Sequence, residues 1–94
     1  MKIEELEPNS KVVSLVGAIM HLDEPTESTT GIKVQEGVLS DKTGQVKLSL
    51  WGDDQVGKFE VGEKVLISTG WCKEFKEDLQ VSTGKFGKIT KVPI

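Results

Sequence analysis

Hydrophobic and polar residues alternate along much of this chain, which is the pattern of half-buried β-strands. In the clearest run, residues 45–51, valine and leucine occupy the even positions and lysine, serine and tryptophan occupy odd ones. Successive side chains of a strand point to opposite faces. The run therefore predicts a strand with an apolar inner face, and it places Trp51 on the outer, polar face together with Lys47.

Similar alternation, separated by turn residues, predicts an all-β chain. The expected strands are residues 11–22, 33–41, 45–51, 64–70 and 79–91, the last one interrupted near Gly84 and Gly87. Gly17, in the middle of the first strand, predicts a bulge or a sharp bend. The sequence Asp41-Lys42-Thr43-Gly44 is typical of a tight hairpin turn between the second and third strands.

Two short apolar segments are expected to cover the core. Ile3 and Leu6 belong to an N-terminal turn that Pro8 ends, and this turn is predicted to close one end of the core. The connection between the third and fourth strands has room for at most one helical turn, and Val56 and Phe59 are predicted to pack from it onto the core.

The aromatic residues are the first indication of function, because both tryptophans fall outside the predicted core. Trp71 follows the fourth strand and begins a run in which Trp71 and Phe75 are interleaved with Lys73 and Lys76. We expect this run to form a long hairpin loop or two strands that extend beyond the sheet. Rings that stack on bases, beside ammonium groups that contact phosphates, suit a single-stranded nucleic acid.

Structural roles are the alternative for these rings. Trp51 is equally well explained as a residue that folds over the rim of the core with its indole N–H in water. Trp71 and Phe75 could instead pack on each other across the hairpin, since aromatic pairs are common between neighbouring strands.

Charge is distributed unevenly along the 94 residues, whose net charge is −3. Residues 1–10, 23–36 and 52–63 are acidic, whereas residues 79–94 carry three lysines and no acid. A nucleic-acid interface depends on the charge of one face rather than on the total. Five lysines fall in or beside the strands that carry the tryptophans, and we expect them to contact phosphates, although each taken singly could be an ordinary surface residue: Lys47, Lys73, Lys76, Lys85 and Lys88.

All twelve basic residues are lysine, and the chain has no arginine. Arginine is the usual residue for bidentate recognition of guanine, whereas lysine acts as a mobile point charge. A nucleic-acid-binding role would therefore involve little sequence recognition.

Catalysis and metal binding have little support. The chain contains one histidine, His21, and one cysteine, Cys72, and neither has an evident partner that would complete a catalytic set or a zinc site. The adjacent carboxylates Asp23-Glu24 and Asp53-Asp54 fall in polar segments typical of solvated turns. We therefore expect neither an enzyme nor a cofactor or metal.

Length and composition fit one globular domain over residues 1–94, with 36% hydrophobic and 29% charged residues. No apolar run is long enough to cross a membrane, and the first residues lack the apolar stretch of a signal peptide. The expected location is the cytoplasm, in association with the nucleoid.

Five strands, a long bent first strand and a connection between the third and fourth strands correspond to the order of an OB-fold, a partly open Greek-key barrel. Residues 41–52 follow the pattern D-x-T-G-x-V-x-L-x-L-W-G. With Leu6-Glu7-Pro8-Asn9, Val61-Gly62-Glu63, Trp71 and Leu79-Gln80-Val81, this stretch resembles archaeal single-stranded-DNA-binding proteins of the replication protein A type over nearly the whole chain.

The resemblance implies roles for particular residues. In the family, the tryptophan that ends the third strand and the aromatic residues of the following hairpin stack on bases, and these match Trp51, Trp71 and Phe75. Relatives of the single-domain kind usually continue into a flexible tail, so this chain is also consistent with one OB module of a longer protein. The four-cysteine zinc motif of some larger relatives is missing.

The function expected from the sequence is single-stranded DNA binding without strong sequence preference, in replication or repair. The expected partners are single-stranded DNA and, beyond it, other replication or repair proteins or further OB domains, with no membrane contact. Two alternatives remain at this point: an OB-fold module for protein interaction or assembly, and an OB domain that binds RNA. Sequence does not separate DNA from RNA, because recognition of the 2′-OH depends on contacts that a sequence does not reveal.

Overall fold

The computed structural model describes residues 2–52, 55–75, 78–83 and 87–92 of the chain. Its elements are a short 3₁₀ helix η1 (Ile3–Glu5) and the strands β1 (Ser10–Leu22), β2 (Thr26–Glu27), β3 (Lys33–Asp41), β4 (Gly44–Trp51), β5 (Lys64–Phe75), β6 (Asp78–Ser82) and β7 (Lys88–Lys91). In the described ranges, no helix is long and apolar enough to cross a membrane.

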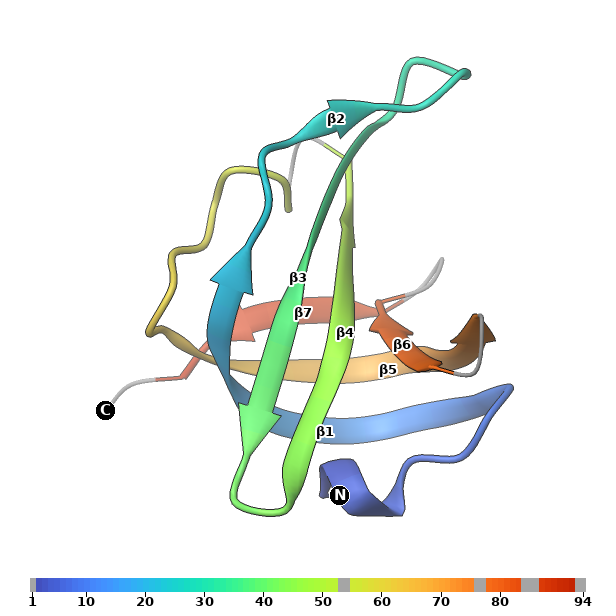
Figure 1. Ribbon diagram of the computed structural model, residues 1–94, viewed down its shortest axis with the longest axis vertical. Helices are drawn as coiled ribbons and strands as arrows, with labels where there is room; N and C mark the ends of the chain where they lie inside the picture. Colours follow the sequence, from blue (N-terminus) through green and yellow to red (C-terminus); the bar gives the residue numbers. More distant parts are fainter. Residues whose placement is uncertain (1, 53–54, 76–77, 84–86, 93–94) are drawn as a thin grey trace.

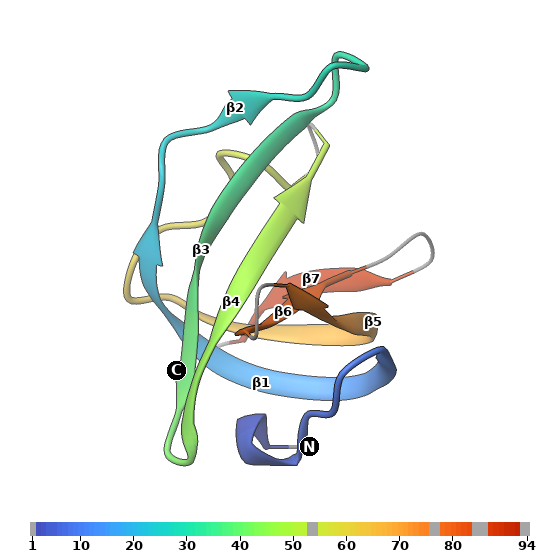
Figure 2. The same ribbon diagram turned by 45° about the vertical axis from the view of Figure 1, so that its right-hand side comes forward.

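The strands form a closed ring (Figures 1 and 2). β1 pairs antiparallel with β5 through its first part and with β3 through its last part, and β3 pairs with β4. The ring closes because β6 pairs antiparallel with β5 and parallel with β4. The predicted five-stranded barrel is thus confirmed. The fifth strand is present as β6 and β7, two separate segments that both pair with β5.

β1 pairs with two strands, with β5 up to Ala18 and with β3 from Ala18 onwards, and Gly17, where the sequence predicts a bulge or bend, lies directly before this change of partner. A Cβ atom at Gly17 would lie 2.8 Å from Leu39 Cγ and 2.9 Å from the Ser40 carbonyl oxygen, so any larger residue would push β3 away. The next residue, Ala18, pairs with both neighbouring strands. A bulge follows between Ile19 and His21. Bend and bulge together turn β1 from β5 towards β3.

The core lies inside the ring and follows the predicted alternation at the even positions of β4, whereas at the start of β1 the expected order is wrong, since Val12 is buried and Val13 is 73% exposed. Fully or almost fully buried side chains come from each long strand: Val12, Leu15, Ile19, Leu39, Leu48, Leu50, Val65, Ile67, Cys72 and Val81. The two predicted covering segments are confirmed, since Ile3, Leu6, Val56 and Phe59 are all buried in this cluster. Burial raises the pKa of the Cys72 thiol, which is a core residue.

Asp41 joins the β3–β4 hairpin turn to η1. Its carboxylate accepts hydrogen bonds from the Thr43 side chain and from the backbone N–H groups of Ile3, Thr43 and Gly44. Desolvation by burial would raise the pKa of Asp41, but these hydrogen bonds to the charged form outweigh it and lower the pKa to about 2. The turn that the sequence predicts therefore also anchors the N-terminal segment.

Asp41→Asn is expected to destabilise the fold at neutral pH and to make the free energy of unfolding depend less on pH in the acid range. Because the folded-state pKa of Asp41 lies below its ordinary value of 3.8, its contribution is complete above that value and is lost as pH falls towards about 2. Urea unfolding of both proteins near neutral pH and at about pH 3 measures the effect. The stability difference between them should shrink at the lower pH, and a difference that does not change with pH would contradict this role.

Candidate nucleic-acid interface

Strand pairing brings Trp51 and Trp71 to one face of the barrel from strands that are distant in sequence. Trp71 on β5 lies opposite Ser82 on β6, and Ser82 lies opposite Ser49 on β4. Residues that pair across strands project from the same face. Trp51 follows Ser49 by two positions on β4 and therefore shares this face.

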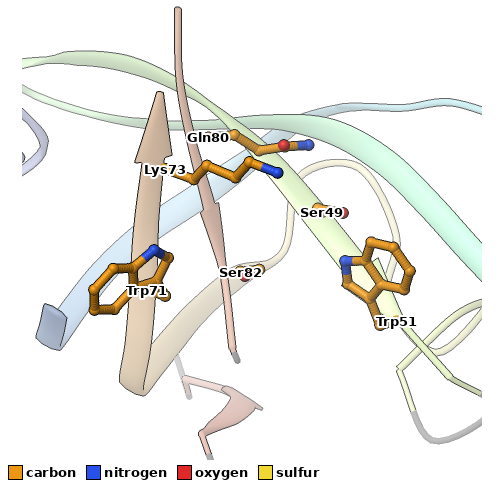
Figure 3. A pocket seen from close by; sticks show the side chains of 6 residues that line it. All are labelled: Ser49, Trp51, Trp71, Lys73, Gln80 and Ser82. Atoms are coloured by element: carbon orange, nitrogen blue, oxygen red, sulfur yellow. The ribbon is translucent and has the colours of Figure 1, made fainter. Parts of the chain in front are cut away.

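A hollow of about 380 Å³ lies between the two tryptophans (Figure 3). Two aromatic and four polar side chains line it: Ser49, Trp51, Trp71, Lys73, Gln80 and Ser82. Figure 3 shows the indoles on opposite sides, with Ser82 between them and the Lys73 side chain extending from β5 towards β4. Trp51 is 47% and Trp71 40% exposed. Their ring faces are thus available to a planar ligand, on a surface that also carries a cation.

Trp51 is held in place by a buried amide. Gln55 Oε1 accepts a hydrogen bond from the Trp51 backbone N–H at 3.1 Å, and Gln55 Nε2 donates to Thr83 Oγ1 at 2.8 Å. Both Gln55 and Thr83 are buried. The end of β4 is therefore tied to the residue that follows β6, which fixes the position of Trp51 at one edge of the hollow.

The position of Trp71 depends on the residue before it, Gly70, which lets β5 pack closely against β6. A Cβ atom at Gly70 would lie 2.6 Å from the Ser82 carbonyl oxygen and 2.8 Å from Ile67 Cγ2, so only glycine allows β5 to pack this closely. Thr69, immediately before, has a positive φ of 55°. This local distortion of β5 precedes the segment that directs Trp71 and Lys73 outwards.

Comparison with known proteins finds two similar chains. No family model matches the chain. Over 93 residues it is 31% identical to the single-stranded DNA binding protein Ssb of Saccharolobus solfataricus, covering 96% of this chain and 62% of that protein. Over 92 residues it is 29% identical to replication factor A of Methanothermobacter thermautotrophicus, covering 94% of this chain and 12% of that protein. The chain thus spans less than two thirds of either relative.

Solved structures show the same fold. An OB domain from Thermoplasma acidophilum superposes with a TM-score of 0.80 at 24% identity, covering 100% of this chain and 87% of that one. A domain of replication protein A from Methanococcus maripaludis gives a TM-score of 0.78 at 22% identity, covering 97% of this chain and 94% of that one. The chain is an OB-fold domain. The resemblance to archaeal single-stranded-DNA-binding and replication protein A-type proteins is confirmed with it.

The OB-fold domain brings together three of the residues that the sequence singles out, Trp51, Trp71 and Lys73, around the hollow. Phe75 ends β5 opposite Asp78, and its backbone alone is described. The predicted phosphate contacts Lys76 and Lys85 lie outside the described residues. The run from Trp71 to Phe75 belongs to β5 and pairs with β6, so it is a strand rather than a loop. Trp71 and Cys72 also pair with β1 and therefore lie within the sheet rather than beyond it.

Two of the predicted lysines, Lys47 and Lys88, do not line the hollow. Lys47 pairs across β4 and β6 with Gln80, and its ammonium group forms an ion pair of 3.2 Å with Asp78. Lys88 begins β7 opposite Ser68 and is exposed. Lys73 is therefore the cation that the described residues place in the hollow itself.

The sequence analysis missed several residues of this face. Lys11 lies opposite Trp71 on β1 and is exposed, so a further cation flanks the ring, whereas Glu36 lies opposite Ser49 on β3. Neither is recognisable from its neighbours in sequence, because only the strand order places it there. Among the residues with described positions, no group of three or more His, Cys, Asp or Glu side chains could hold a metal ion.

Proposed function

We propose that this OB-fold domain binds single-stranded DNA without strong sequence preference, in DNA replication and repair. Bases stack on Trp51 and Trp71, and Lys73 and Lys11 contact the phosphates. The single observation that supports this most is the pair of half-exposed tryptophans on opposite sides of one hollow, since aromatic platforms beside cations are what single-stranded nucleic acids require.

The similar proteins support the same proposal. One is named for single-stranded DNA binding and the other for replication. We infer a binding module rather than an enzyme, located inside the cell with the nucleoid, which acts beside other replication or repair proteins or further OB domains. RNA would use the same stacking chemistry and is a ligand to include in binding assays.

Weak base preference follows from the side chains available. The chain has no arginine to form bidentate hydrogen bonds with guanine. Stacking uses the flat face that every base has. Affinity should therefore depend mainly on the number of bases that stack and on the phosphates that lysines contact.

The affinity for oligo(dT) is expected to fall with salt at a log–log slope of roughly −2 to −3, because three or four lysines of the binding face, Lys73 and Lys11 among them, would each neutralise one phosphate and contribute about 0.7. Titration at several salt concentrations, followed by tryptophan emission, measures the slope. Binding should quench the emission because the indoles stack on bases. A slope near zero, or no quenching, would contradict the proposal.

Asp78→Asn sharpens this test. It removes the carboxylate that pairs with Lys47 at 3.2 Å, which frees a cation beside the hollow. The variant should bind more tightly at low salt, with a slope steeper by about 0.7. Asp23→Asn is the matched control, since it removes the same charge from an exposed pair with His21 whose two members do not line the hollow. Equal slopes in all three proteins would show that Lys47 does not contact phosphate.

A further inference from the structure

The polar side chains between the two tryptophans have no structural task of their own. No hydrogen bond or ion pair joins the side chains of Ser49, Gln80, Ser82 or Lys73 to another residue with a described position. Ser49 is the most notable of them, because it is only 3% exposed and still lines the hollow. Among the described residues no buried side-chain N or O atom lacks a partner, so these polar groups reach the open space of the hollow, where they can form hydrogen bonds with a ligand.

Two other glutamines show what a structural amide does in this fold. Gln55 uses its oxygen for the Trp51 N–H and its nitrogen for Thr83. Gln35 donates to the Asp23 carbonyl oxygen and accepts from the Gly57 N–H. Both of these amides are fully engaged within the barrel. The amide of Gln80 makes no such contacts and instead lines the hollow (Figure 3).

The spacing of the rings leaves room for a nucleotide above these polar groups. Trp71 and Ser49 are two strands apart in one row, and Trp51 is two residues further along β4. With strands ~4.8 Å apart and a rise of ~3.3 Å per residue, the Cα atoms of the tryptophans lie ~12 Å apart. Bases in a stack repeat every ~3.4 Å. One base sandwiched by both rings would need only ~6.8 Å between them. At this Cα spacing the two tryptophans are therefore expected to stack on different bases, and the polar groups of the hollow lie between them.

We propose that the hollow holds one nucleotide by its base edge, through hydrogen bonds from Gln80 and the hydroxyl groups of Ser49 and Ser82, while Trp51 and Trp71 stack on the bases to either side. The inference rests on the proposed single-stranded DNA binding. A glutamine amide carries both a donor and an acceptor and can therefore pair with the edge of any base. The subsite thus adds affinity at one position without creating strong sequence preference.

A scan with modified oligo(dT) tests this subsite. In each oligonucleotide one thymine is replaced by N3-methylthymine, which loses the edge N–H donor and keeps the stacking face. One position should respond, with binding weakened roughly three- to tenfold, the range of one net hydrogen bond. If no position or every position responds while unmodified oligo(dT) still quenches tryptophan emission, the edge subsite is overturned and the proposed function stands. Loss of quenching with unmodified oligo(dT) would instead overturn both.

Gln80→Met provides the second measurement, because methionine keeps the length of the side chain and removes the amide. The variant should bind unmodified oligo(dT) more weakly by a similar factor, and the modified thymine should no longer weaken its binding further. Gln45→Met is the matched control, because Gln45 is an exposed residue of β4 that does not line the hollow. Its affinity for unmodified and modified oligo(dT) should equal that of the wild type. Unchanged sensitivity to N3-methylthymine in Gln80→Met would overturn the role of Gln80.

Discussion

Replacing Trp51 or Trp71 with alanine is expected to weaken the binding of oligo(dT) by roughly 1–3 kcal/mol for each ring, the usual contribution of one base stacked on an aromatic side chain. The fold should survive both changes, because these side chains are 47% and 40% exposed. The chain has two tryptophans, so each variant retains one, and the remaining ring reports on its own contact. Fluorescence titration gives the affinity, and urea unfolding gives the stability.

Conservative and core variants show whether stacking is responsible. Trp51→Phe and Trp71→Phe keep an aromatic face and should recover much of the lost affinity. Leu50→Ala, one residue away from Trp51 on the opposite face of β4, should instead destabilise the fold by roughly 2–5 kcal/mol, because Leu50 is fully buried. The assignment of the interface to Trp51 and Trp71 would be contradicted if neither alanine variant weakened binding, or if both unfolded the domain.

Duplex DNA is expected to bind far more weakly than a single strand of the same length. Its bases are already stacked and paired, and freeing one costs a few kcal/mol. Among single strands, oligo(dT) should bind somewhat better than oligo(dA), because its bases stack least on each other and give up least on binding. Mixed sequences should fall between the two. Binding isotherms of these ligands at one fixed salt concentration measure the differences.

The barrel was largely predictable because alternation and turn chemistry are local. The even positions of residues 46–50 and the turn at Asp41 fix both the face and the register of the β3–β4 hairpin. Gly17 marks the bend of β1 for a similar reason, since a mid-strand glycine signals close backbone approach. The two exposed tryptophans were also predictable, because one lies on the polar parity of its strand and the other follows the end of a predicted strand.

The remaining features of the site depend on contacts between distant segments. Nothing near Asp78 in the sequence indicates that it pairs with Lys47, because the parallel pairing of β4 and β6 brings them together. Lys11 lies opposite Trp71 only because β1 pairs with β5. Similarly, Gln55 resembles any polar loop residue until the barrel buries it beneath Trp51. Strand order across the ring was therefore the missing information.

Competition between single-stranded and duplex DNA tests the stacking interface most directly. Labelled oligo(dT) bound to the domain is challenged with unlabelled oligo(dT) or with duplex of the same length, at fixed salt. The single strand should displace the label efficiently, whereas the duplex should displace it only at far higher concentration. Equal competition by the duplex would contradict base stacking on Trp51 and Trp71 and would indicate a nonspecific electrostatic contact.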